Sequence, residues 1–261
     1  MLLVANSCLL NGVFASIRIG ANSFTFSNDI NGIEYQDSLC IFRAYIADGI
    51  CSALIFSFLL QAAYRYVIAI HPHWLFWQIP RVQIVLICLT WLFGLLYPLE
   101  FLLRDEIIYN AANQICQLSI QPSFSIVYMV SCIYLIPISL IVLIYLELVR
   151  YVRKIRERVV STNVLLRAQR ELKMVRQIIL VISALLVLGL PYTTFIVMSF
   201  VTELPKYHFR IALVFLDASL VFICVSLFYF NDPLKMSILK RIGRRRNMVT
   251  TIIVLRDGVM M

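Results

Sequence analysis

Six long blocks of apolar residues constrain the fold of this chain more than any other feature. They lie at residues 2–20, 39–69, 82–103, 125–149, 174–201 and 209–230. A helix needs about 20 residues to cross the hydrocarbon core of a bilayer, and most of the blocks reach that length. Within each block, apolar residues cover all sides of the predicted helix instead of forming one stripe, which is typical of helices that face lipid. The sequence therefore predicts an all-α membrane helical bundle with six visible spans.

The composition supports this prediction and argues against a soluble protein. Of the 261 residues, 61% are hydrophobic and 14% are charged, whereas a soluble domain carries about 25% charged residues. The alternative is an unusually apolar soluble helical protein. The net charge of +9 comes from short basic segments between the blocks, which indicate membrane topology and not a nucleic-acid partner.

Lysine and arginine residues predict the orientation, because they concentrate in cytoplasmic loops. Segment 150–176 holds nine of them and segment 233–246 holds six. The opposite loops carry Asp29, Glu34 and Asp37. We therefore expect a cytoplasmic C-terminus and, with six spans, a cytoplasmic N-terminus.

The ends of the chain carry further expectations. Block 2–20 is short, because Arg18 follows only sixteen apolar or small residues. No lysine or arginine precedes Arg18, whereas a signal peptide begins with basic residues. The block is therefore interpreted as a membrane span that lacks part of its cytoplasmic end. Met1 would then be an internal methionine of a longer product. Asp232 and Pro233 predict the start of an amphipathic surface helix over 233–242. We expect one membrane domain over 1–246 and a cytoplasmic tail over 247–261.

A series of landmarks resembles the rhodopsin-like (class A) G-protein-coupled receptors. Cys40 precedes the motif Tyr64-Arg65-Tyr66 by the spacing that this family has between its third-helix cysteine and arginine. Further matches in chain order are Trp91, Pro137 with Tyr145, Pro191, Tyr229, and Asn231-Asp232-Pro233. The chain resembles such a receptor without the first transmembrane helix, and the resemblance implies a membrane receptor that acts as a transducer in signal transduction.

The resemblance implies a site at each end of the bundle. It implies a disulfide bond between Cys40 and Cys116 on the outer side. It also implies coupling to a heterotrimeric G protein on the inner side, through outward movement of the helix at 174–201. Glu171 is a candidate partner that holds Arg65 in the resting state; the alternative is a solvated acid. The residues implied in coupling are Arg65, Tyr66, Glu171, Tyr145, Tyr229 and Pro191.

The sequence also departs from the family pattern. Tyr64 stands where the acid before the arginine is usual, and Asn11 replaces the sodium-coordinating aspartate. Gly189 replaces the sixth-helix tryptophan, and Val225-Ser226 replace the last helix's Asn-Pro. These changes indicate a divergent receptor whose activation switch works differently or not at all.

Two acids inside apolar blocks are ligand-pocket candidates, because an acid within a membrane is costly. Asp48 lies eight residues after Cys40, and Asp217 lies seven residues after Arg210, so both lie at a similar depth. The alternative is that each pairs with a local donor such as Arg43 or lies in a water-filled vestibule. The aspartate of amine receptors would fall at Ala47, so a biogenic amine is not supported.

Other function classes find less support. The sequence lacks the hydrolase and phosphate-loop motifs that would indicate an enzyme, and we expect no metal or cofactor. A small transporter would show internal repeats, and none is convincing. A receptor-derived product that does not signal is the third alternative. The main prediction is a plasma-membrane receptor for an unknown extracellular ligand, embedded in the lipid bilayer.

Overall fold

The computed structural model describes residues 2–32, 36–71, 73–121, 123–157, 162–202 and 205–230. Within these ranges, some side chains between residues 155 and 188, those of residues 75 and 78, and those of residues 227–230 are not described. The predicted surface helix at 233–242 and the tail at 247–261 lie outside the described residues. The chain divides into two compact units, residues 1–222 and 223–261. The following description concerns the first unit, together with the end of its last helix.

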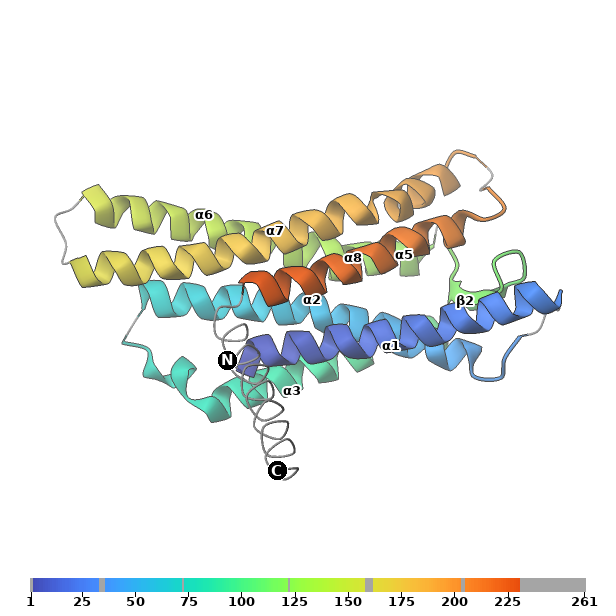
Figure 1. The fold of residues 1–261 in the computed structure, drawn as a ribbon, viewed down its shortest axis with the longest axis horizontal. Coiled ribbons are helices and arrows are strands. Elements are labelled where there is room, and N and C mark those ends of the chain that lie inside the picture. The colour runs from blue at the N-terminus through green and yellow to red at the C-terminus, as the bar shows by residue number, and fades with distance from the viewer. Residues whose placement is uncertain are drawn as a thin grey trace, which may run out of the picture. The chain divides into compact units, whose positions relative to one another are not determined.

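Helix α2 is the central element of the first unit (Figure 1). It contacts α1, α3, α6, α7 and both strands of a short hairpin. The hairpin is antiparallel and pairs Ile107 with Leu118 and Asn110 with Ile115. The helices and strands are α1 (Leu2–Asn31), α2 (Cys40–Ile70), a 3-10 turn (Leu75–Gln78), α3 (Pro80–Leu96), α4 (Leu99–Leu103), β1 (Ile107–Asn110), β2 (Ile115–Leu118), α5 (Phe124–Met129), a π-helical turn (Val130–Leu135), α6 (Ile136–Glu157), α7 (Thr162–Ser199) and α8 (His208–Phe230).

Local sequence explains where several helices begin and bend. Pro80 occupies the first turn of α3, where the missing amide proton has no intrahelical partner to lose. Ser123 caps α5 by accepting a hydrogen bond from the amide of Ile126. The π-helical turn ends two residues before Pro137, and such turns occur mostly as single turns within α-helices.

The predicted membrane bundle is confirmed. Within the described residues, five helices are long and apolar enough to cross a membrane: Leu2–Asn31, Cys40–Ile70, Pro80–Leu103, Phe124–Lys154 and His208–Ser226. The block at 174–201 falls within α7, a helix of 38 residues that contains Pro191. The chain is therefore a multi-pass helical membrane protein.

Three helices extend beyond the predicted spans. The first block was expected to end near residue 20, but α1 continues to Asn31. Arg18 does not end it, because its side chain pairs within the bundle instead of reaching the water layer. At the other end, α6 continues to Glu157 and α7 already begins at Thr162, since a helix can extend past the bilayer where polar residues still favour it.

Helices α2 and α3 touch backbone to backbone at two glycines. A Cβ atom on Gly94 would lie 2.7 Å from the carbonyl oxygen of Gly49 and 2.8 Å from the Cβ of Ala53. Small residues allow such close approach between membrane helices, where van der Waals packing drives association. No larger side chain fits at Gly94 without moving α3 away from α2.

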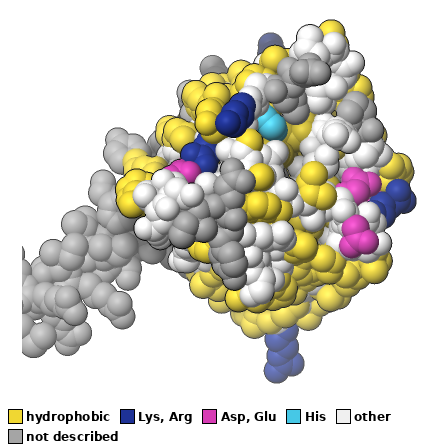
Figure 2. Space-filling view, turned by 90° about the vertical axis from the view of Figure 1, so that its right-hand side faces the viewer, with side chains coloured by type: hydrophobic (Ala, Val, Ile, Leu, Met, Phe, Trp, Pro, Cys, Tyr) yellow, Lys and Arg dark blue, Asp and Glu magenta, His cyan; other side chains and the backbone are white. Residues whose placement is uncertain are grey.

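The hairpin packs into one end of the bundle. Ile107, Cys116 and Leu118 are buried in the same apolar cluster as Tyr97 and Phe101. Figure 2 looks onto this end and shows acidic and basic side chains among uncharged polar atoms, with hydrophobic side chains gathered along the margin. This distribution is expected where a bundle emerges from lipid into water.

Candidate functional site

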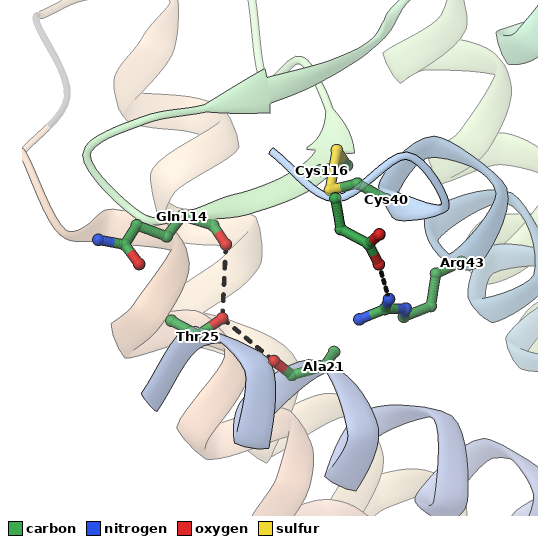
Figure 3. The surroundings of a disulfide bond; sticks show 7 residues. Ala21, Thr25, Cys40, Arg43, Gln114 and Cys116 are labelled. Atoms are coloured by element: carbon green, nitrogen blue, oxygen red, sulfur yellow. Dashed lines mark hydrogen bonds and ion pairs between the residues drawn. A yellow bond between two sulfur atoms is a disulfide. The ribbon is translucent and has the colours of Figure 1, made fainter. Parts of the chain in front are cut away.

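The hairpin is joined covalently to the start of α2. Cys40 and Cys116 form a disulfide bond, with their Cα atoms 5.5 Å apart, which confirms the pairing that the family resemblance implied (Figure 3). Thr25 of α1 lies beside it, donating to the Ala21 carbonyl at 3.1 Å and lying 3.4 Å from the carbonyl oxygen of Gln114. The disulfide thus fixes the hairpin between α1 and α2.

A small cavity of about 50 Å³ opens beside this disulfide. It lies between α1, α2 and β2, and Arg18, Arg43 and Ala47 contribute to its lining. Both arginines already have acidic partners, because Arg43 pairs with Asp37 and Arg18 pairs with Asp217. Ligand pockets usually enclose about 300–1,000 Å³, so this cavity does not accommodate a whole ligand.

Asp217, one of the two predicted pocket acids, forms an ion pair that crosses from α8 to α1. Its Oδ1 lies 2.9 Å from Nε of Arg18, and its Oδ2 lies 2.7 Å from Nδ2 of Asn22. The Arg18 side chain is 9% exposed and that of Asp217 is 31% exposed. The carboxylate of Asp217 is therefore occupied by groups of the protein itself.

A second ion pair joins the same two helices with the charges reversed. Arg210 of α8 donates to both carboxylate oxygens of Asp29 in α1, at 2.8 and 2.9 Å. Its guanidinium also lies over the ring of Tyr207, 5.5 Å from the centroid. Helices α1 and α8 are consequently held together at two levels by complementary charges.

Asp48, the other predicted pocket acid, has a different environment. It is half-buried on α2, and the phenol groups of Tyr97, Tyr134 and Tyr192 lie within electrostatic range of its carboxylate. These tyrosines come from the end of α3, the π-helical turn and α7. None of the described arginine, lysine or histidine side chains forms an ion pair with Asp48.

A hydrogen-bond network that the sequence did not reveal joins α1, α2 and α3. Trp91 donates from Nε1 to Oδ1 of Asn6 at 2.9 Å, and Asn6 donates to Ser57 at 3.1 Å. Ser7 contacts the Ser57 hydroxyl at 2.6 Å and accepts from Gln61 at 2.6 Å. The sequence signal that could have revealed this network is the presence of polar side chains inside otherwise apolar blocks.

The far end of α2 carries the predicted coupling residues. Arg65 and Tyr66 are half-buried there, and the guanidinium of Arg65 lies 5.8 Å from the ring centroid of Tyr64. Tyr145 of α6 packs nearby against a buried cluster of Ala69, Leu148 and Val175, so α2, α6 and α7 meet at this end.

The contacts of the other three predicted coupling residues are not defined. Pro191 lies inside α7 and is half-buried. The side chains of Glu171 and Tyr229 lie outside the described residues. The pairing of Arg65 with Glu171 therefore remains a prediction.

Comparison with protein-family models identifies the family of the chain. The family model of the 7 transmembrane receptor (rhodopsin family) matches residues 16–232. No curated protein matches the sequence. Among the described residues, no group of three or more histidine, cysteine, aspartate or glutamate side chains is placed to hold a metal ion.

Proposed function

Because the chain belongs to the rhodopsin family of seven-transmembrane receptors, we propose that it transmits the binding of an extracellular ligand to a cytoplasmic heterotrimeric G protein. Proteins of this family are receptors and not enzymes. The observation that carries the proposal is helix α2, which links the disulfide at one end to Arg65 at the other. Arg65 lies 25 residues after Cys40, a distance of about 38 Å at 1.5 Å per residue, which exceeds the roughly 30 Å hydrocarbon core.

We place the disulfide end outside the cell and the Arg65 end in the cytoplasm. The last turns of α6 expose Arg150, Arg153 and Lys154, and basic residues are retained on the cytoplasmic side. A disulfide bond persists in an oxidising compartment, which the extracellular side provides. The proposal includes the plasma membrane as the location and a cytoplasmic C-terminus.

The proposed activation step is an outward swing of the inner part of α7. Val175 is fully buried against Ala69 of α2 and Leu148 of α6, and separating them would open a cavity for a G-protein segment. Pro191 removes a backbone hydrogen bond from α7. The hydroxyls of Thr193 and Thr194 both donate to the Leu190 carbonyl, and such side-chain bonds bend helices. These features support a hinge near Gly189 and Pro191.

Glu171→Ala is expected to raise ligand-independent signalling about two- to fivefold. Glu171 lies on α7, and the proposed pair with Arg65 would hold the inner end shut; losing a pair worth up to about 1 kcal/mol shifts the equilibrium by that factor. The measurement is second-messenger production in cells at matched surface expression. Glu147→Ala is the control, because Glu147 forms an exposed pair with Arg150 within α6 alone. Equal basal signalling in wild type and both variants would remove the lock from the mechanism.

The non-signalling alternative has one observation in its favour. The residue before Arg65 is Tyr64, whose ring faces the guanidinium, whereas signalling family members usually carry an acid there. A protein that reaches the cell surface but changes no second messenger, in any of these variants, would favour that alternative. Uptake of a solute by the same cells would favour a transporter.

A further inference from the structure

The connection between α2 and α3 carries a patch of exposed apolar side chains. Trp74 is 54% exposed, Phe76 is 63% exposed and Ile79 is 43% exposed. Trp74 and Ile79 flank the 3-10 turn, and Phe76 lies within it. The turn contacts α2 and α3, and Figure 1 shows it on the side of α2 opposite α6 and α7. The patch is therefore a separate surface from the place where α2, α6 and α7 meet.

Three backbone amides of this connection are paired within it. The amide of Trp74 donates to the His71 carbonyl at 3.0 Å, and the amide of Trp77 donates to the Trp74 carbonyl at 3.3 Å. The amide of Ile79 donates to the Phe76 carbonyl at 3.2 Å. An unpaired polar group is costly away from water. Because these amides are paired, the turn can enter a lipid interface without that cost.

Two side-chain contacts hold the connection in place. The ring of His71 stacks on the ring of Trp74, with the centroids 4.7 Å apart and 17° between the ring planes. Gln83, a buried residue of α3, donates from Nε2 to the Trp77 carbonyl at 3.5 Å. The exposed rings are thus presented by a turn that is fixed to the end of α2 and to the start of α3.

The patch continues the lipid-facing side of α3. Ile84, Val85 and Leu89 are exposed on this helix, and a membrane-crossing helix presents such residues to lipid. The span Pro80–Leu103 has 24 residues, which is about 36 Å at 1.5 Å per residue, whereas the hydrocarbon core is about 30 Å thick. The patch directly before this span therefore falls at the level of the lipid headgroups.

The chemistry of the patch suits that depth. Tryptophan is enriched at membrane interfaces because its ring is apolar and its indole N–H reaches water or a headgroup. The sequence contains no aspartate or glutamate between Asp48 and Glu100, so no acid of this region opposes contact with an anionic leaflet. Leaving the rings in water would cost about 25 cal/mol for each Å² of apolar surface.

We propose that the connection between α2 and α3 is a membrane-surface anchor that inserts Trp74, Phe76 and Ile79 into the headgroup region of the bilayer. The occupant of the patch is lipid and not a protein partner. The anchor holds the Arg65 end of α2 at a fixed depth in the membrane. This inference goes beyond the proposed receptor function and does not depend on it.

A nitroxide label at residue 76 measures this insertion. Of the seven cysteines of the full chain, all but Cys40 and Cys116 are replaced by serine. Phe76→Cys is then labelled in nanodiscs of phosphatidylcholine and phosphatidylserine, and its collision rates with dioxygen and with a water-soluble nickel chelate are compared. Leu89→Cys, on the lipid-facing side of α3, is the reference in lipid. Ala111→Cys, exposed in the turn of the hairpin, is the reference in water.

The ratio of dioxygen to chelate collision rates should be at least about fivefold higher at residue 76 than at residue 111, because lipid excludes a polar chelate but not dioxygen. Residue 89 should give a higher ratio still. Trp74→Cys in the same background should place its label at the depth of residue 76, and it carries the test where the Phe76 variant does not fold.

Three results would overturn the inference. A ratio at residue 76 equal to that at residue 111 would show that the patch faces water. Slow collisions with both reagents would show that it packs against protein. Access to the chelate that is lost only when a heterotrimeric G protein is added would assign the patch to that partner instead of lipid. The measurement itself needs neither ligand nor G protein, so a failure to couple leaves its outcome unchanged.

Discussion

Replacing both Cys40 and Cys116 by serine is expected to lower the free energy of unfolding by roughly 4 kcal/mol, the chain-entropy value for a loop of this length. The two cysteines are 76 residues apart in sequence, so the bond restricts a large part of the unfolded chain. It also holds Ile107 and Leu118 of the hairpin in the apolar cluster. The measurement is equilibrium unfolding of the purified protein in mixed detergent micelles.

The control for this experiment is Cys88→Ser. Cys88 is a free, exposed cysteine of α3, so the same chemical change there should alter the unfolding free energy by less than about 0.5 kcal/mol. Treatment with a reductant should destabilise the wild type and leave the double serine variant unaffected. Equal stability of the double variant and the control would mean that the hairpin is held without the bond.

Arg18→Met is expected to destabilise the protein by about 3 kcal/mol. The substitution leaves the carboxylate of Asp217 with Asn22 as its hydrogen-bond donor among the described residues, and removing one partner of a largely buried pair costs far more than the pair contributes. The Arg18 side chain is 9% exposed, so water cannot replace it readily. A double-mutant cycle with Asp217→Asn isolates the interaction from other effects of each change.

Arg150→Met provides the matched comparison for that cycle. Arg150 and Glu147 form an ion pair at 2.6 Å, but their side chains are 72% and 52% exposed, and such surface pairs contribute about 0–1 kcal/mol. The same substitution should therefore cost much less at residue 150 than at residue 18. Equal costs at the two sites, or no coupling between Arg18 and Asp217, would show that the α1–α8 ion pair does not stabilise the bundle.

The sequence was sufficient to predict the membrane bundle but not the partners of its buried charges. Long apolar blocks lie in lipid or against one another, where each segment must satisfy its own backbone hydrogen bonds. They therefore predict helices whatever the packing. The first span was expected to end near residue 20 because Arg18 resembled a residue at the water boundary, whereas α1 continues to Asn31. Its partner Asp217 is 199 residues away, and only the packing of α1 against α8 brings the two together.

Asp48 and Asp217 illustrate the same limit at the candidate site. Counting residues from the outer end placed both at a similar depth, and no pattern of residues distinguished the two acids. Their difference depends on the neighbours of each helix face: Arg18 and Asn22 bind the carboxylate of Asp217, whereas none of the described cations pairs with Asp48. Rotation and partner choice are tertiary properties, and periodicity alone does not encode them.

The hydrogen-bond network that joins α1, α2 and α3 could not be predicted from hydropathy patterns. Asn6, Ser57 and Gln61 are single polar residues within apolar blocks, where average hydropathy conceals them. Each is satisfied by a neighbouring helix, as buried polar groups in a bilayer must be. Trp91 was singled out through the family resemblance, but its partner Asn6 became apparent only from the packing of α1 beside α3.

Receptor-catalysed nucleotide exchange tests the central claim most directly. The purified full chain in lipid nanodiscs is mixed with each class of heterotrimeric G protein, and the rate of guanine-nucleotide release is recorded for wild type, Arg65→Ala and Arg81→Ala. Arg81 is an exposed arginine at the start of α3 and serves as the control. We predict faster release from at least one G protein with wild type and Arg81→Ala, and loss of that acceleration with Arg65→Ala. No acceleration from any G protein, or acceleration that Arg65→Ala leaves unchanged, would contradict the account.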